Sequence, residues 1–178
     1  KFCASTLGGL VRNLSAGEIL GQVLAVNALG GGDDKNRYVT NIVLMGSGEP
    51  LDNFDNVTKF LRLVSAEEGI NISLRNISLS TCGVVPRMRQ LADMGLHVNL
   101  TLSLHNADNE QRKQIMPVTN AYSVEDAVAA CRYYFEQTGR RIIVEYTLID
   151  GQHDTYAHAL KLASLLRNMS VHVNVIAL

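Results

Sequence analysis

The sequence predicts an α/β fold in which helices pack outside a parallel β-sheet. Stretches with the helical spacing of apolar residues alternate along the chain with short runs rich in β-branched residues. Hydrophobic residues occupy 47% and charged residues 19% of the 178 positions, a composition that excludes a disordered chain. This length corresponds to about one domain with one hydrophobic core. We therefore expect a single α/β domain over residues 1–178.

The first half of the chain is predicted to contain three helices and three strands. Ser15 can cap the first helix, with Glu18 three residues later as in a capping box, and Gly30 ends it. Tyr38–Met45 has the β-branched content of a buried strand. The following elements are a helix over Phe54–Glu68, a strand over Leu74–Ser80, a helix over Pro86–Met94 and a strand over His97–Leu104.

The second half continues the alternation. Ser123 can cap an amphipathic helix that runs to Gln137 and stops at Gly139. The other elements are a short polar helix over Asp108–Ile115, a strand over Arg141–Ile149, a helix over Thr155–Arg167 and a strand over Val171–Leu178. A complete barrel of eight βα units needs about 250 residues. An open partial barrel and a doubly wound sheet therefore remain as architectures.

Charge and composition exclude several classes of function. Lys and Arg number 16 and Asp and Glu 17, a net charge of −1, which argues against this segment alone gripping a phosphate backbone. No apolar run approaches the ~18 residues of a membrane span, so we expect no membrane association. Three widely separated cysteines favour a reducing, cytoplasmic location over a disulfide framework. The first residue is Lys1 and no signal segment follows, so either a segment was removed or this is a piece of a longer chain.

The predicted strand ends are the places to search for chemistry, because parallel α/β sheets bind ligands at their carboxyl edge. The first strand leads into Met45-Gly-Ser-Gly-Glu-Pro50, where Gly48 allows close backbone approach and Glu49 offers a carboxylate to an amine. A dinucleotide fingerprint is disfavoured because Leu51 stands at its final glycine position and Pro50 interrupts the turn. A plain tight turn is the structural alternative.

The next two strand ends are also small and polar. Ser80 is followed by Thr-Cys-Gly83, and Ser103-Leu104-His105 closes the third strand. Hydroxyls on one strand and an imidazole on the next suit a ribose, a carboxylate or an adenine edge. A single histidine at a strand end is more often an ordinary rim residue, but three polar strand ends together indicate a small-molecule site.

Other candidate residues have simpler interpretations. Cys131 lies on the apolar face of its helix, and Cys82 is also expected to be buried. The run Glu110–Lys113 is interpreted as a solvated helix face, with contact to a polyanionic substrate as the alternative. His97, His153, His158 and His172 lack metal-ligand spacing.

Several motifs, in a fixed order, resemble one known family over essentially the whole chain. Phe2-Cys3 resembles the end of its cluster motif, C-x-x-x-C-x-(aromatic)-C. The further matches are Gly46-Ser-Gly-Glu-Pro50-Leu-Asp-Asn-Phe54-Asp-Asn56, Ser80-Thr-Cys-Gly83-Val-Val-Pro86, Leu102-Ser-Leu-His105, Met116-Pro117 and Glu145-Tyr-Thr-Leu-Ile-Asp-Gly151. The family is that of the radical S-adenosylmethionine (SAM) methyltransferases that act on adenine in rRNA and tRNA.

The resemblance implies a partial (β/α)6 barrel whose first strand lies before Lys1. It implies that Cys3 is one of three thiolate ligands of a 4Fe–4S cluster, whose open iron binds SAM. Gly48 and Glu49 would bind the amino end of SAM. The rest of the SAM pocket would be lined by Ser80, Ser103, Leu104 and His105.

The resemblance also implies a reaction. An electron from a donor such as a flavodoxin reduces the cluster, and SAM then releases a 5′-deoxyadenosyl radical. The radical takes hydrogen from a methylated cysteine, and the resulting carbon adds to adenine. Pro50 and Cys82-Gly83-Val84-Val85 are closer to the branch that modifies carbon C2 than to the branch that modifies carbon C8.

Parts of the family pattern lie outside this sequence. With Cys3 last in C-x-x-x-C-x-x-C, cysteines are expected immediately before Lys1 and four residues earlier. The methyl-carrying cysteine and the RNA-binding extension are also absent, so the resemblance implies that residues 1–178 are a radical SAM core truncated at both ends, and we expect it to be inactive alone. The alternatives are a non-catalytic nucleotide- or adenosyl-binding domain, another radical SAM iron–sulfur enzyme, and an unrelated α/β-barrel aldolase or epimerase. The last needs a Lys or a metal triad at the strand ends, and the sequence offers neither there.

Overall fold

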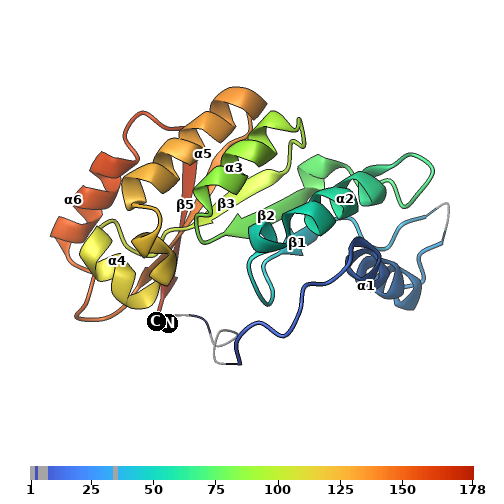
Figure 1. The fold of residues 1–178 in the computed structure, drawn as a ribbon, viewed down its shortest axis with the longest axis horizontal. Helices are drawn as coiled ribbons and strands as arrows, with labels where there is room; N and C mark the ends of the chain where they lie inside the picture. The colour runs from blue at the N-terminus through green and yellow to red at the C-terminus, as the bar shows by residue number, and fades with distance from the viewer. Residues whose placement is uncertain (1–2, 4–7, 34–35) are drawn as a thin grey trace.

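The computed structural model describes Cys3, residues 8–33 and residues 36–178, and these form a curved sheet with helices packed against it (Figure 1). Every helix and strand expected from the sequence is present. In chain order the helices and strands are α1 (Ala16–Leu29), β1 (Ile42–Leu44), α2 (Phe54–Ser65), β2 (Ile77–Thr81), α3 (Val85–Asp93), β3 (Asn99–Ser103), α4 (Asn109–Ile115), α5 (Val124–Thr138), β4 (Ile142–Leu148), α6 (Tyr156–Leu165) and β5 (Val171–Ala177).

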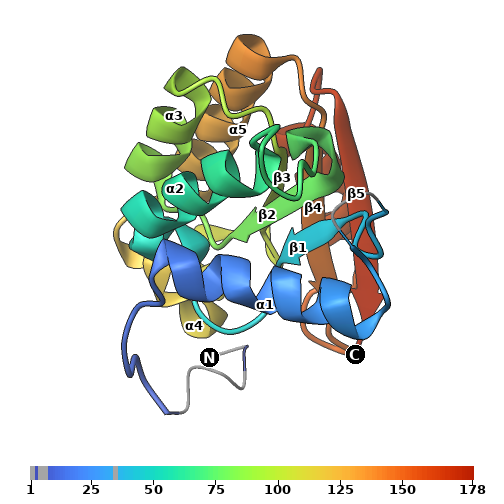
Figure 2. The ribbon, with the colours of Figure 1, turned by 90° about the vertical axis from the view of Figure 1, so that its right-hand side faces the viewer.

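The sheet has five strands in the order β1-β2-β3-β4-β5, and each neighbouring pair is parallel. A doubly wound sheet reverses direction at a switch point in its strand order, and this sheet does not. Figure 2 shows α2, α3 and α5 together on one side of the strands. The sheet is therefore wound in one direction, as in a segment of a (β/α) barrel, and the doubly wound alternative is excluded.

The core lies between the strands and these helices. In β2 the side chains of Ile77, Leu79 and Thr81 are buried, while Ser78 and Ser80 between them are half-buried. Alternation with a period of two sends these sets to opposite faces of the sheet. The apolar set meets the helix layer, where Phe60 of α2 belongs to the same buried cluster. The polar set faces the other side, where the candidate site lies.

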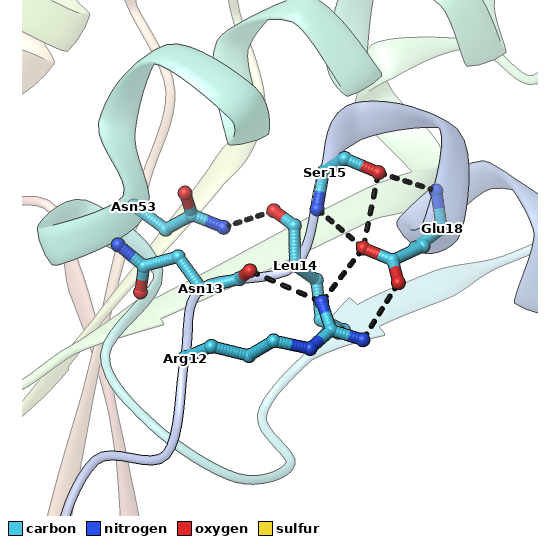
Figure 3. A network of polar contacts seen from close by, with 6 residues as sticks. All are labelled: Arg12, Asn13, Leu14, Ser15, Glu18 and Asn53. Atoms are coloured by element: carbon cyan, nitrogen blue, oxygen red, sulfur yellow. Dashed lines mark hydrogen bonds and ion pairs between the residues drawn. The ribbon is translucent and has the colours of Figure 1, made fainter.

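The start of α1 is held by the capping box that the sequence predicts. Ser15 accepts a hydrogen bond from the Glu18 amide, and the Glu18 carboxylate accepts one from the Ser15 amide at 2.8 Å. Arg12 donates two hydrogen bonds to the same carboxylate, at 2.7 and 2.9 Å (Figure 3), and this lowers the pKa of Glu18 to about 2. Asn53, just before α2, donates to the Leu14 carbonyl at 2.7 Å. The cap therefore also joins α1 to α2.

Some elements are shorter than predicted. The strand expected over Tyr38–Met45 is restricted to Ile42–Leu44, because the amides of Tyr38 and Val39 donate to Asn27 Oδ1 of α1 instead of to a strand. The strand expected from Leu74 starts at Ile77, after a 3₁₀ turn over Leu74–Asn76 that Ser73 caps. Side-chain acceptors from neighbouring segments thus take backbone donors that the apolar pattern assigns to strands.

Candidate functional site

The predicted site residues of β2 and β3 come together at the carboxyl ends of these strands. Ser80 pairs in register with Thr101, two residues before Ser103. The hydroxyl oxygens of Ser80 and Ser103 are 3.1 Å apart, and both side chains are half-buried. Each hydroxyl has further lone pairs and can still bond to a ligand. The structure thus joins two serines 23 residues apart into one polar pair.

Glu49 connects the loop after β1 to the end of β2. Its Oε1 accepts from the Leu51 amide at 3.0 Å, and its Oε2 accepts from the Cys82 amide at 2.8 Å. Gly48 before it has φ = 90°, and an added Cβ would meet nothing within 4 Å. Backbone conformation, and not crowding, therefore requires glycine there. The carboxylate is half-buried and retains lone pairs for an amine.

His105 occupies a strained and buried position just after β3. Its φ is 56°, a left-handed conformation that is uncommon outside glycine. Its Nδ1 lies 2.9 Å from Thr147 Oγ1, and the amides of Leu104 and His105 both donate to the Glu145 carbonyl at 3.1 Å. Burial, together with the charges of Arg112 and His153, lowers the pKa of His105 to about 4. The imidazole is therefore neutral near pH 7.

The prediction of a solvated face over Glu110–Lys113 is wrong for Arg112. This side chain is fully buried, and its guanidinium donates to the carbonyls of Cys82, Ser103 and Leu104 and to Thr119 Oγ1. Glu110 and Gln111 of the run are exposed, as expected. The seven-residue helix α4 lies over the strand ends, so one of its polar residues points inward and meets backbone acceptors.

Glu145 and Asn174 are polar residues beside the predicted site; the sequence reasoning named Glu145 only as the start of a motif and did not name Asn174. Ser103, Glu145 and Asn174 occupy one row across β3, β4 and β5. Glu145 is only 8% exposed, and Asn174 Nδ2 donates to its carboxylate at 2.8 Å. A carboxylate inside a strand that is otherwise mostly apolar is the signal that could have identified it.

The cysteines occupy different environments. Cys131 is buried in the core as predicted, which raises its pKa to about 12. Cys82 is half-buried at the site instead of fully buried, and burial and the neighbouring Glu49 carboxylate raise its pKa. Cys3 is half-buried, whereas Phe2 of the same motif lies outside the described residues. In the described part of the chain no three His, Cys, Asp or Glu residues are grouped so as to hold a metal ion.

Two further observations bear on the location of the site. A polar hollow lined by Arg37, Glu67 and Asn71 lies near the amino ends of β1 and β2, and none of the predicted site residues lines it. The predicted residues instead form an open edge at the carboxyl ends of the strands. None of the helices in the described ranges is long and apolar enough to span a bilayer.

The fold and the order of these strand-end residues are those of a known superfamily. Residues 1–163 match the radical SAM superfamily, and the chain belongs to it. This confirms the family resemblance, and with it the partial-barrel fold.

Two curated relatives and one solved structure are similar to nearly the whole of this chain. The chain is 55% identical to a protein named probable dual-specificity RNA methyltransferase RlmN from Clostridium perfringens (strain 13 / Type A), over 99% of this chain and 49% of that one. It is 52% identical to the protein of the same name from Lachnoclostridium phytofermentans, over 99% and 48%. A crystal structure of a radical SAM methyltransferase from Sphaerobacter thermophilus superposes with a TM-score of 0.92 at 42% identity, covering 98% of this chain and 51% of that one. The chain spans about half the length of the curated relatives it matches.

Proposed function

We propose that the carboxyl edge of β1–β3 binds SAM and that this chain is the SAM-binding part of an RNA methyltransferase. The observation that carries the proposal is the convergence at one edge of the Glu49 carboxylate, the Ser80–Ser103 hydroxyl pair and the Leu104–His105 backbone. These groups match the polar groups of SAM, which carries an ammonium, a carboxylate, ribose hydroxyls and an adenine. The donor chemistry of the edge therefore fits the molecule that the superfamily uses.

Each group has a separate role. The Glu49 carboxylate and the Gly48 backbone would bind the SAM ammonium, since a carboxylate accepts charge-assisted hydrogen bonds from it. Ser80 and Ser103 would bind the carboxylate and ribose of SAM, because each hydroxyl both donates and accepts. Leu104 and His105 are both buried, so their part would be to shape the floor of the pocket. His105 would remain neutral and place no repelling charge near the sulfonium.

Cys3 would contribute one thiolate to a 4Fe–4S cluster, a ligand type that such clusters require. The cluster would need two further thiolates from outside this sequence, as the motif spacing predicts. When bound, the cluster supplies an electron that cleaves SAM and generates a radical on its 5′ carbon. The chain's own contribution is to hold SAM in one orientation at the edge of the sheet.

The names of the relatives support RNA as the substrate of the complete protein. We propose that it methylates carbon C2 of adenine in rRNA and tRNA through a methyl-cysteine, in the cytoplasm, with a flavodoxin-like electron donor. A net charge of −1 is poorly suited to RNA binding, so RNA contacts would come from regions flanking this chain.

The test is the affinity for SAM of the complete gene product, reconstituted anaerobically. Glu49→Ala is expected to weaken SAM binding at least about tenfold, because it removes the charged partner of the ammonium. Glu49→Gln removes the charge and keeps one of the two acceptor oxygens, so it retains the contact to only one of the backbone amides of Leu51 and Cys82. Glu67→Gln, at an exposed carboxylate away from the site, is the matched control. Unchanged SAM affinity in both Glu49 variants would show that the pocket lies elsewhere.

A further inference from the structure

We propose that Arg112 is a positioning residue that holds the SAM-binding edge in its binding shape. The inference rests on the proposed function, because it assigns a role toward the same ligand. The Arg112 guanidinium does not itself line the SAM-binding edge. It acts through hydrogen bonds to the backbone of residues that line this edge. No sequence motif used to recognise the site contains this arginine.

The first observation is the set of hydrogen bonds from the guanidinium. Nη2 donates to the Cys82 carbonyl at 2.7 Å and to the Ser103 carbonyl at 3.0 Å, and Nε donates to the Leu104 carbonyl at 2.8 Å. Nη1 donates to Thr119 Oγ1 at 2.8 Å, in the turn after α4. One side chain therefore ties together the segment after β2, the end of β3 and the turn after α4.

The second observation is that the backbone carbonyls bound by Arg112 belong to the predicted pocket or to a segment that contacts it. Ser103 and Leu104 are predicted pocket residues, and Cys82 receives its other backbone contact from the pocket carboxylate, with its amide donating to Glu49 Oε2 at 2.8 Å. The peptide units on either side of Cys82 are thus held by Glu49 on one side and Arg112 on the other. If Arg112 is lost, Cys82 loses one of these anchors, and the orientation of the Glu49 carboxylate becomes less fixed.

The third observation is the charge. The side chain is fully buried, and within the described residues it forms no ion pair; all four partners are neutral oxygens. Burial lowers its pKa to about 10, so the guanidinium still carries its charge near pH 7. A buried cation is costly, and only a planar group with several fixed donors reaches acceptors in this arrangement. A lysine offers one nitrogen and cannot bridge the same carbonyls.

The experiment compares variants of the complete gene product, reconstituted anaerobically and assayed well below their melting temperatures. Arg112→Lys is expected to raise the Kd for SAM at least about tenfold, and Arg112→Gln to raise it further. The KM for SAM should rise with Kd, while kcat at saturating SAM changes by less than about threefold. A role in folding alone would lower the melting temperature without this split between KM and kcat.

Tyr134→Phe is the matched control. The buried Tyr134 hydroxyl donates its hydrogen bond to the carbonyls of Leu96 and Val98, just before β3. The substitution removes a buried hydrogen bond from the opposite end of the same strand. This variant is expected to lose melting temperature and to keep the Kd for SAM within about twofold of wild type.

Thr119→Val keeps the proposal testable if the Arg112 variants do not fold. Thr119 is not a predicted pocket residue, and its hydroxyl accepts from Arg112, so its loss can reach SAM only through the guanidinium. We expect about a threefold rise in the Kd for SAM.

Two results would overturn the inference. The first is wild-type SAM affinity in Arg112→Lys, or in Thr119→Val if Arg112→Lys does not fold. The second is a loss of SAM affinity in Tyr134→Phe as large as that in the Arg112 variants. Should Glu49→Ala weaken SAM binding while Arg112→Lys does not, only the inference fails; should neither weaken it, the proposed function fails.

Discussion

At the scale of single residues, the candidate site depends on side chains that the surrounding fold holds in uncommon backbone conformations, buried positions or cross-strand contacts. His105 has a left-handed backbone and a buried ring, and its neighbour Ser103 is joined to a serine on another strand. The sequence indicated these residues because small and polar side chains follow buried strands. It did not indicate that Arg112 is buried, because a run of charged residues in a short helix is normally solvated. Which of its residues faces inward depends on where the helix docks.

The lowered pKa of His105 predicts a dependence of stability on pH. Its pKa is about 4 in the fold, against 6.5 ordinarily, so between these values the unfolded chain binds a proton that the folded chain does not. The contribution of His105 to the free energy of unfolding is therefore complete above pH 6.5. It is lost as the pH falls toward 4, by at most about 3.5 kcal/mol at roughly 1.4 kcal/mol per pKa unit. Urea denaturation at a series of pH values measures this loss.

His105→Asn is the comparison for this measurement, because asparagine tolerates a left-handed backbone and does not titrate in the range. We expect the variant to lose less stability than the wild type on acidification from pH 7 to 4.5. The pKa of His153 is also lowered by burial, so a residual slope is expected. Identical pH profiles in wild type and variant would contradict the assignment to His105.

At the scale of helices and strands, local signals predicted where helices begin better than where strands begin. The predicted capping box of Ser15 with Glu18 and the predicted Ser123 cap are both present, and Gly139 ends α5 with φ = 66°. These signals succeed because a cap involves residues within one turn of each other. The strand expected from Tyr38 is shorter because Asn27, eleven residues away, takes its first amide. A side-chain acceptor at that separation is not visible in a local pattern.

The cap of α5 gives a prediction at this scale. Ser123→Ala is expected to lower the free energy of unfolding by about 1 kcal/mol, because the Asp126 amide loses its acceptor. Ser123→Gly should cost only a few tenths of a kcal/mol, since glycine is tolerated at this position. Urea denaturation of both variants compares them directly. A negligible loss in Ser123→Ala would mean that the cap does not stabilise α5, and equal losses in the two variants would contradict the tolerance for glycine.

At the scale of the whole molecule, the sheet order places the site. Because β1, β2 and β3 are neighbours and parallel, the loops after them meet at one edge, although they are far apart in the chain.

The proposed cluster gives a prediction for the complete protein. The gene should encode cysteine immediately before Lys1 and again four residues earlier, because iron–sulfur clusters need more than one thiolate. Cys3→Ser is expected to lower the iron and sulfide bound per chain after anaerobic reconstitution. Cys131→Ala removes a buried core thiol and is the control, with unchanged iron content expected. Any other residue at either upstream position would remove the basis for the cluster.

The sequence by itself determined the class of fold, the order of helices and strands, the caps and the polar strand ends. These depend on apolar periodicity and on short-range hydrogen bonds, which a stretch of ten to fifteen residues contains. The tertiary structure decided the strand order, the pairing of Ser80 with Ser103 and the burial of Arg112 beneath the site. These depend on sheet register and on hydrogen-bond acceptors from three separate segments, which meet only when the whole chain has folded.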